Sequence, residues 1–298
     1  MSTVVRIARL LKVPAVLKFL RVYRMAVRVS TFVWRKTSQD SPGTIRWKAQ
    51  ARRLYSQFIK PGDLVFDVGA NRGTRVDVFR DLGATVVAVE PQEHCVAILQ
   101  RKFRQQVFCE QVALGSAVGE AEMMIRDDAD TSSTLSKEFI EAAENYGAPK
   151  INDSVWNRKI TVKVSTLDNL IAKYGCPSFC KIDVEGYEYE VLMGLSQPVS
   201  AISIEFHPML FEALVRNIKR LQALGFHEYN YSMGETMRLA LSSWISADDI
   251  VSLISRMPRD LAYGDIYVRR DRAETLEKRP PAVDRASWTA TRKAGGTK

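Results

Sequence analysis

Residues 64–74 of this chain read Leu64-Val65-Phe66-Asp67-Val68-Gly69-Ala70-Asn71-Arg72-Gly73-Thr74 and combine a strand, a glycine turn and the start of a helix. Five residues of strand character run straight into a turn that contains Gly69 and Gly73, and a helical pattern follows. A glycine can take a positive φ angle, and it lets a ligand approach the bare backbone. Gly73 opens the next helix, so we expect its amide to face whatever lies above the strand end. Asp67 places a carboxylate beneath this turn.

An acidic residue ends the second strand. Thr85–Val89 is an apolar run, and Glu90 and Pro91 follow it. In nucleotide-binding α/β folds, a carboxylate at this point accepts hydrogen bonds from both hydroxyls of a ribose. A glutamate can also end a strand without such a role. Because the glycine turn stands one strand earlier, we interpret Glu90 as a nucleoside ligand.

Strand and helix patterns alternate between residues 44 and 270. This alternation predicts an α/β fold, a Rossmann-like seven-stranded mostly parallel sheet with helices on both faces. The expected strands are Leu64–Val68, Thr85–Glu90, Gln106–Leu114, Ser178–Val184, Ala201–Phe206, Phe226–Tyr231 and Asp265–Arg269. Two further strands, 119–126 and 159–164, lie outside this series. The first of them would form a hairpin with the strand before it. Ser165 would cap the helix that starts at Thr166.

Three motifs resemble those of a known enzyme family. VFDVGANRG (65–73) and VVAVEP (86–91) resemble motifs one and two of class I S-adenosylmethionine-dependent methyltransferases. CKIDVEGYEYEVLMGL (180–195) resembles the signature of the FkbM family within that superfamily. The resemblance covers roughly Pro61 to Arg270 and is weak from Asp127 to Arg158. It implies an enzyme that methylates hydroxyl oxygens on sugars, polyketides and other secondary metabolites, with S-adenosylmethionine as its cofactor.

The resemblance also assigns cofactor contacts. Asp67 would order the glycine turn and its water, and Glu90 would accept from the ribose diol. Val112 and Ala113 would lie against the adenine, which needs mostly apolar surface. The methionyl part of the cofactor would be held by residues of the turn itself, namely Gly69, Ala70, Asn71 and Gly73.

Ligands of open α/β sheets lie above the carboxyl ends of the strands, near the switch in strand order. An acidic rim beside a glycine turn suits the sulfonium cation, the amino-acid end and the ribose diol of S-adenosylmethionine. We expect the polar residues at the strand ends to converge on one such edge: Asp67, Glu90, Asp183, Glu185, Glu205 and His207.

Methyl transfer from a sulfonium is an in-line displacement, so the protein mainly aligns and desolvates the reactants. An alcohol acceptor must also lose its proton, and a carboxylate or histidine within hydrogen-bonding distance can take it. Asp183 and His207 are the predicted proton acceptors. Glu205 is predicted to orient His207 or to bind an acceptor hydroxyl. The alternative for His207 is a strand-end histidine satisfied by a backbone carbonyl.

A divalent ion is an alternative use of the same carboxylates. Asp183, Glu185 and Glu205 offer the oxygen ligands that magnesium prefers. Their spacing does not require an ion, so we predict no metal site and keep magnesium as an alternative cofactor. Glu185 and Gly186 can instead shape the turn into the next helix.

The composition of the 298-residue chain, 46% hydrophobic and 26% charged, is ordinary for one large folded domain with appendages. The net charge of +9 comes entirely from residues 1–36, which hold nine basic and no acidic residues. Because the remainder is neutral, we expect no nucleic-acid partner. The cysteines lack paired zinc spacing and are expected to be buried free thiols, which suits a reducing cytoplasmic compartment. They are Cys95, Cys109, Cys176 and Cys180.

Residues 1–43 are predicted to form a basic amphipathic helical extension. Pro14 divides two helical patterns, and in each pattern the basic residues fall on one arc. Such helices suit a peripheral position at an anionic membrane surface. The alternatives are an extension that packs on its own domain or on a dimer partner, and a targeting peptide. No apolar run in this segment is long enough for a spanning helix.

Residues 44–270 form the predicted methyltransferase domain, and the polar tail 271–298 is predicted to be disordered. Residues 127–158 are polar, with one short helical pattern at 136–145. We interpret this stretch as a lid over the substrate, with an ordinary surface insertion as the alternative. The sequence does not determine the oligomeric state.

Two other functions stay open. A nicotinamide-dependent oxidoreductase also uses a glycine turn and an acid after the second strand, but its further glycines would have to replace Asn71 and Thr74. A non-catalytic nucleoside-binding protein could act as a membrane-attached scaffold through residues 1–36. The presence of Asp67, Glu90 and Asp183 argues for an enzyme. Its expected acceptor is a small molecule, a glycan or a glycolipid.

Overall fold

The computed structural model describes residues 41–127, 129–145, 156, 158–197, 199–259 and 263–270. The basic extension predicted for residues 1–43, apart from its last three residues, lies outside this description. The tail 271–298 and part of the predicted lid also lie outside it. Among the described helices, none combines the length and the apolar character that crossing a membrane requires.

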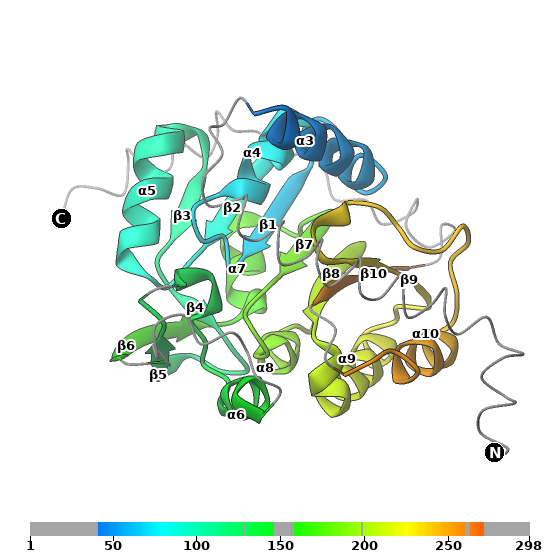
Figure 1. Ribbon diagram of the computed structural model, residues 1–298. Helices are drawn as coiled ribbons and strands as arrows, with labels where there is room; N and C mark the ends of the chain where they lie inside the picture. The colour runs from blue at the N-terminus through cyan, green and yellow to red at the C-terminus, as the bar shows by residue number, and fades with distance from the viewer. Residues whose placement is uncertain are drawn as a thin grey trace, which may run out of the picture. The chain divides into compact units, whose positions relative to one another are not determined.

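A seven-stranded sheet carries the predicted site, with the strand order β3-β2-β1-β7-β8-β10-β9 (Figure 1). All hydrogen-bonded neighbours are parallel, except that β10 runs antiparallel to both β8 and β9. The predicted Rossmann-like, mostly parallel sheet is therefore confirmed. Its strands are β1 (Leu64–Val68), β2 (Thr85–Val89), β3 (Phe108–Glu110), β7 (Phe179–Ile182), β8 (Ala201–Phe206), β9 (Glu228–Met233) and β10 (Gly264–Arg269).

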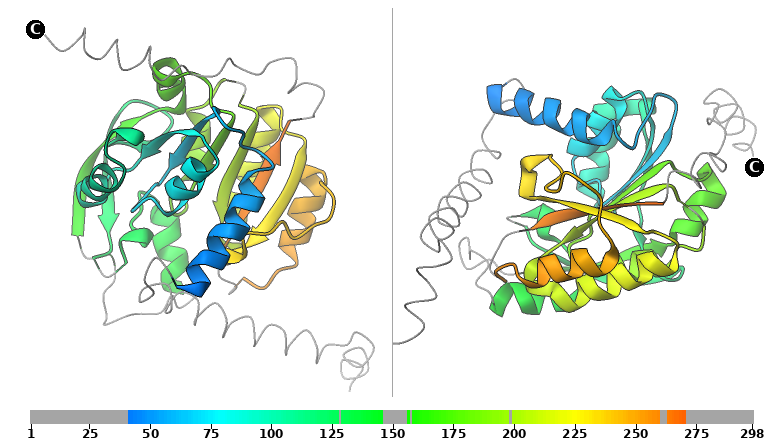
Figure 2. Two further views of the ribbon diagram at one scale, coloured as in Figure 1. Left: turned by 90° about the horizontal axis from the view of Figure 1, so that it is seen from above. Right: turned by 90° about the vertical axis from the view of Figure 1, so that its right-hand side faces the viewer.

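Helices cover both faces of this sheet (Figure 2). On one face, Phe79 of α4 (Thr74–Asp81) packs edge-on against Phe179 of β7, and α5 (Glu93–Phe103) lies beside α4. Tyr55, the last residue of α3 (Pro42–Tyr55), contacts the same two rings. The other face is covered by α7 (Leu167–Tyr174), α8 (Glu188–Met193), α9 (Phe211–Ala223) and α10 (Ala247–Ser255).

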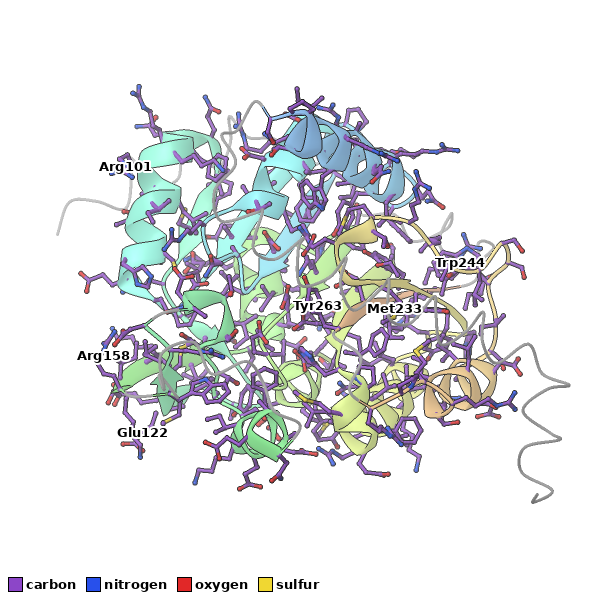
Figure 3. The ribbon with its side chains drawn as sticks, in the orientation of Figure 1. Arg101, Glu122, Arg158, Met233, Trp244 and Tyr263 are labelled. Atoms are coloured by element: carbon purple, nitrogen blue, oxygen red, sulfur yellow. The ribbon has the colours of Figure 1, made fainter. Side chains whose placement is uncertain are left out.

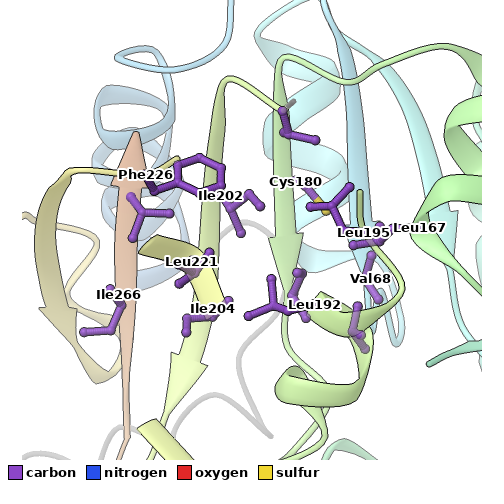
Figure 4. Packing of buried hydrophobic residues seen from close by; sticks show 14 of the residues in the cluster. Val68, Leu167, Cys180, Leu192, Leu195, Ile202, Ile204, Leu221, Phe226 and Ile266 are labelled. Carbon is purple, nitrogen blue, oxygen red and sulfur yellow. The ribbon is translucent and has the colours of Figure 1, made fainter. Parts of the chain in front are cut away.

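The two faces of the sheet differ in polarity. Strand residues such as Phe66 and Cys180 point toward α7–α10 and join a large apolar cluster (Figure 4). Residues that alternate with them point to the α4 face, because successive side chains of a strand face opposite sides. On that face Asp67, Lys181 and Ser203 are cross-strand neighbours, and all three are buried. Buried polar side chains need hydrogen-bond or charge partners. The structure on this face therefore depends on polar interactions as well as on apolar packing.

The prediction of one strand over Gln106–Leu114 is wrong. Only β3 joins the large sheet, whereas β4 (Ala113–Leu114) belongs to a three-stranded sheet with the order β4-β6-β5. The predicted hairpin is also wrong, because β5 (Gly119–Ile125) pairs with β6 (Arg158–Ser165). This small sheet buries an apolar cluster of its own, which draws the chain away from the large sheet. The cluster consists of Ala113, Met123, Ile125, Val162 and Val164.

The helix after β6 is capped one residue later than predicted. Ser165 is the last residue of β6, so its backbone is used in strand pairing. Thr166 is the cap, and its Oγ1 accepts a hydrogen bond from the Asn169 amide at 3.1 Å. Between β5 and β6 the chain forms a 3₁₀ turn, η2 (Asp130–Ser132), and the helix α6 (Lys137–Asn145).

Candidate active site

The glycine turn after β1 is fixed by its two neighbouring strands. Gly69 has a φ of +81°, and a Cβ at this position would lie 1.7 Å from the Asp183 carbonyl oxygen. Only glycine therefore allows the chain after β7 to pass so close. On the other side, the amides of Gly69 and Ala70 both donate to the Val89 carbonyl, at 2.9 and 3.0 Å. The turn thus touches both Asp183, which follows β7, and Val89, the last residue of β2 before Glu90.

Gly73 is needed for helix packing. It has a φ of +78°, and a Cβ there would lie 2.5 Å from Phe103 and 2.7 Å from Leu99 of α5. Its amide donates to the Ala70 carbonyl at 2.8 Å and closes the turn. The expectation that this amide faces a ligand is therefore wrong, because the turn itself uses it. A contact between Gly73 and the cofactor stays a prediction.

Glu90 lies beside the glycine turn at the same edge of the sheet. Its Oε2 accepts the amide of Asn71 at 2.9 Å, and its Oε1 accepts the amide of Gln92 at 2.8 Å. Asn71 takes a φ of +44° that presents this amide. Burial raises the pKa of Glu90, and the two amide hydrogen bonds partly offset that rise. Each carboxylate oxygen keeps a further lone pair, so Glu90 can also accept from a diol.

Val112 and Ala113 follow β3, the strand next to β2. The amide of Glu90 donates to the Glu110 carbonyl at 3.0 Å, so the chain leaves β3 close to Glu90. Val112 is half-buried against the apolar cluster of the large sheet, and Ala113 is buried in the small sheet. The two residues therefore stand where the two sheets diverge. Their predicted contact with adenine stays a prediction.

A buried lysine holds the Asp183 carboxylate. Lys181 is 2% exposed, and its Nζ lies 2.5 Å from Oδ2 of Asp183. Burial alone would lower the pKa of Lys181, but Asp183 and Asp265 raise it. Burial would likewise raise the pKa of Asp183, and the ammonium group outweighs this effect and lowers it. Asp183 is therefore ionised at neutral pH.

Asp67 lies opposite Lys181 on β1. Its side chain is 1% exposed, and its Oδ2 has no hydrogen-bond partner among the described residues. Burial raises the pKa of Asp67 to about 6, against the opposing effects of Lys181 and Arg75. An acceptor atom with this burial requires a water or ligand donor. Asp67 thus fits its predicted part in ordering the turn and a water.

Three further predicted residues meet beside Asp183. His207 Nε2 lies 3.1 Å from Oε2 of Glu205 and 3.7 Å from Oε2 of Glu185. His207 therefore contacts carboxylates, unlike the alternative in which a backbone carbonyl satisfies it. The edge-on ring of Phe139 from α6, with centroids 5.0 Å apart, packs against the imidazole.

Protons are distributed unevenly within this group. Burial raises the pKa of Glu205 well above its usual range, and the negative charges of Asp183 and Glu185 add to the rise. The hydrogen bond between Glu205 and Asp183 raises the pKa of Glu205 and lowers that of Asp183. Glu205 is therefore the donor and Asp183 the acceptor. Burial lowers the pKa of His207 to about 4, which leaves a neutral imidazole. The site therefore offers one ionised carboxylate beside a protonated one.

Sequence reasoning missed two residues that hold this site. Lys181 lies in an otherwise apolar strand. Its charge between the apolar residues Cys180 and Ile182 is the signal by which it could have been found. Glu188, 4% exposed, accepts the amides of Val184 and Gly186 through Oε1 at 3.2 and 3.1 Å. It thereby fixes the loop that carries Glu185.

Two groups of side chains in the described part of the chain have metal-ligating atoms within 4.8 Å of one another. One consists of Glu185, Glu205 and His207, and the other of His94, Cys95 and Asp130. The first shares two residues with the set considered for magnesium, and its mixed oxygen and nitrogen donors suit a divalent ion. In the second group, the guanidinium of Arg72 already contacts Asp130 at 2.7 Å.

Comparison with protein families gave a match to the methyltransferase FkbM domain over residues 67–233, more than half of the chain. This match favours a methyltransferase over the nicotinamide-dependent alternative. Comparison with curated proteins gave no match.

Solved methyltransferase structures are similar to this chain at low identity. Precorrin-6y C5,15-methyltransferase from Geobacter metallireducens has 9% identity and a TM-score of 0.39, and the match covers 79% of this chain and 93% of that one. An S-adenosylmethionine-dependent O-methyltransferase from Thermotoga maritima has 11% identity and a TM-score of 0.38, and the match covers 82% of this chain and 71% of that one. Aeropyrum pernix fibrillarin with natively bound S-adenosyl-L-methionine has 14% identity and a TM-score of 0.37, and the match covers 74% of this chain and 76% of that one. None of these similarities bears on the substrate of this chain.

Replacing Lys181 by methionine tests the buried ion pair. The variant leaves Asp183, Asp67 and Asp265 without their buried cation, so we expect a loss of about 3–5 kcal/mol in the free energy of unfolding near pH 8. The loss in the free energy of unfolding depends on pH, because protonation removes the negative charge of the carboxyls. Removing the ammonium raises the pKa values of these carboxyls above their present ones, about 6 for Asp67 and Asp265, so the carboxyls take up protons as the pH falls from 8 to 5 and the loss shrinks at pH 5.

Urea unfolding at pH 8 and pH 5 measures both effects. The control is Lys173→Met, which removes an exposed lysine that contacts Glu110 at 2.5 Å. The control should lose no more than about 1 kcal/mol. Equal losses in the two variants, or a loss for Lys181→Met that does not change with pH, would show that the buried ion pair does not hold the site.

Proposed function

The chain belongs to the FkbM methyltransferase family, and we propose that it transfers the methyl group of S-adenosylmethionine to a hydroxyl oxygen of a sugar, a glycolipid or a secondary metabolite. The observation that carries this proposal is the ionised Asp183. Its backbone carbonyl packs against Gly69 of the cofactor turn, and its carboxylate lies beside Glu205. This arrangement supports a proton acceptor next to the proposed place of the methyl donor.

The residues of the turn fit the cofactor. When bound, S-adenosylmethionine supplies a methyl group on a cationic sulfur. Glu90 can accept from the ribose hydroxyls, because each of its oxygens takes only one backbone amide. The unpartnered oxygen of Asp67 supports a polar contact or an ordered water beneath the methionyl part. The remaining proposed contacts are those with Gly69, Ala70, Asn71, Gly73, Val112 and Ala113.

Asp183 takes the proton of the acceptor hydroxyl in this proposal. A carboxylate that is already ionised at neutral pH can accept a proton as the carbon–oxygen bond forms. In this proposal Glu205 orients Asp183 through their hydrogen bond, and Glu205 together with the neutral His207, which contacts it at 3.1 Å, holds the acceptor. Because an anionic acceptor would be repelled by the ionised Asp183, a neutral polyhydroxylated acceptor suits this region better.

Methyl transfer is measured with S-adenosylmethionine carrying a labelled methyl group and with lipid, glycan and small-molecule fractions of a cell extract. We expect label on a hydroxyl oxygen, and a fall of about 10²- to 10⁴-fold in the Asp183→Asn variant, the range for a general base. The control Asp248→Asn changes an exposed residue of α10 and should keep full activity. A parallel reaction with a chelator tests the magnesium alternative.

Three results would contradict the proposal. Binding of NAD in place of S-adenosylmethionine would support the oxidoreductase. Binding of S-adenosylmethionine without transfer to any fraction would support the non-catalytic scaffold. Label on carbon or nitrogen would show that the acceptor atom is not oxygen.

The Glu90→Ala variant tests the ribose contact. Loss of a charge-assisted hydrogen bond should weaken binding of S-adenosylmethionine by about 1.5–3 kcal/mol in calorimetric titration. Glu93→Ala is the matched control, because Glu93 is an exposed acid three residues further along the chain. An unchanged affinity of a folded Glu90→Ala protein would remove Glu90 from the cofactor site.

A membrane-linked acceptor is proposed from the basic sequence of residues 1–36. In the full chain, replacement of Lys18, Arg21, Arg24 and Arg28 by glutamine should weaken binding to phosphatidylglycerol vesicles at least tenfold, since each cation near an anionic surface contributes about 1 kcal/mol. The control replaces four exposed cations of the domain, Lys137, Lys163, Lys219 and Arg256. Co-sedimentation that is equal for the wild type and both variants would remove the membrane contact.

A further inference from the structure

Residues 129–139, which lie after β5 and include the first turn of α6, form a strap that touches both halves of the proposed site. At its start, the backbone carbonyl of Asp130 accepts from Nε2 of Gln92 at 3.2 Å. Gln92 itself donates its amide to Glu90, the proposed ribose ligand. Gln92 therefore connects Asp130 of the strap to Glu90 at the nucleoside end of the proposed site.

An ion pair fastens the same end to the glycine turn. Oδ2 of Asp130 accepts from Nη2 of Arg72 at 2.7 Å and from Nε at 3.0 Å. His94 Nε2 lies 3.3 Å from the same oxygen. Arg72 belongs to the turn after β1, His94 lies in the first turn of α5, and Gln92 belongs to the loop after β2, so Asp130 connects the two segments that hold the cofactor in the proposed function.

The other end of the strap reaches the acceptor side. Thr134 Oγ1 donates to the Glu185 carbonyl at 2.7 Å. Phe139 packs on His207, and a Cβ on Gly186 would lie 2.8 Å from that of Phe139. Thr134 and Phe139 are buried, whereas the Arg72 side chain is 59% exposed and that of Asp130 is 18% exposed. The strap is thus anchored firmly beside Glu185 and held by a more exposed contact at the nucleoside end.

We propose that Arg72 and Asp130 are positioning residues that close the strap over the nucleoside end of the cofactor site, and that they must part each time the nucleoside enters or leaves. This inference rests on the proposed function, because it requires S-adenosylmethionine to bind at the glycine turn and Glu90. Asp130 and Arg72 join the strap to that turn, and this ion pair, like the contacts of Asp130 with Gln92 and His94, can open without unfolding a strand or a helix. An exposed ion pair is also weak enough to open on the timescale of turnover.

The bland explanation is an ordinary surface ion pair that adds a little stability. Such a pair would change the melting temperature slightly and leave the release rate of the nucleoside unaltered. A closing contact would instead alter the rates of release and entry. The rate of nucleoside release therefore separates the two explanations.

Stopped-flow displacement of S-adenosylhomocysteine from the full chain measures this rate without an acceptor. We expect release to be about fivefold faster in Arg72→Gln and in Asp130→Asn, which corresponds to about 1 kcal/mol. The double variant should be no faster than the singles, because both lose one shared contact. Raising the salt concentration should speed release from the wild type and have less effect on the variants. Arg72→Lys should be intermediate, since it keeps the charge and loses the second donor.

Arg158→Gln is the matched control. Arg158 projects from β6 of the small sheet (Figure 3), and its Nη2 contacts Asp127 at 3.1 Å, with both side chains about half exposed. This control removes an ion pair near the strap that touches neither cofactor loop, so its release rate should equal that of the wild type.

Three outcomes would overturn the strap proposal. They are release within twofold of the wild type in both single variants, additive effects in the double variant, and an equal increase in Arg158→Gln. Should one single variant fail to fold, the other single variant and Arg72→Lys still decide. A wild-type chain that binds neither S-adenosylmethionine nor S-adenosylhomocysteine would overturn the proposed function, and the strap with it. Binding with unaltered release in the variants would overturn the strap alone.

Discussion

The contact between the buried ammonium of Lys181 and the carboxylate of Asp183 is the interaction on which the site depends. A lysine at 2% exposure is costly unless carboxylates surround it, and this chain places Asp67 and Asp265 around it as well. The same arrangement keeps Asp183 ionised at the end of β7. Lys181 and its carboxylates are therefore one electrostatic unit, in which removing the lysine leaves buried negative charge without compensation.

The close approach of Gly69 to the Asp183 carbonyl brings two functions together. Because no side chain fits between them, the turn of the proposed cofactor site is in direct backbone contact with the proposed proton acceptor. Glu185 completes the acceptor side with a φ of +53°, a conformation that β-carbon sterics disfavour. Glu188 and Thr134 hold the loop in this shape through hydrogen bonds to its backbone. The geometry of the site thus comes from backbone constraints as much as from its side chains.

Local sequence predicted the regular elements well and the pairing of strands less well. β1 and β8 were predicted to the residue, because each is an apolar run bounded by turn or polar signals. The stretch 106–126 was assigned to one sheet, although it divides between two, because strand character does not specify a partner. The convergence of Glu90 and the glycine turn followed from parallel topology alone. The burial of Lys181 and the proton on Glu205 could not, since both depend on neighbours from distant strands.

The charge balance of the site suits the proposed reaction. The strongly raised pKa values of Glu205 and Glu185 limit the negative charge beside Asp183, which stays ionised. In the proposed transfer, Asp183 gains the acceptor's proton while the positive charge of the sulfonium disappears. Two opposite charges are thus removed from a poorly solvated region in one step. Separated charges are costly in such surroundings, so the buried carboxylate that makes this sheet expensive to fold also favours the neutral products.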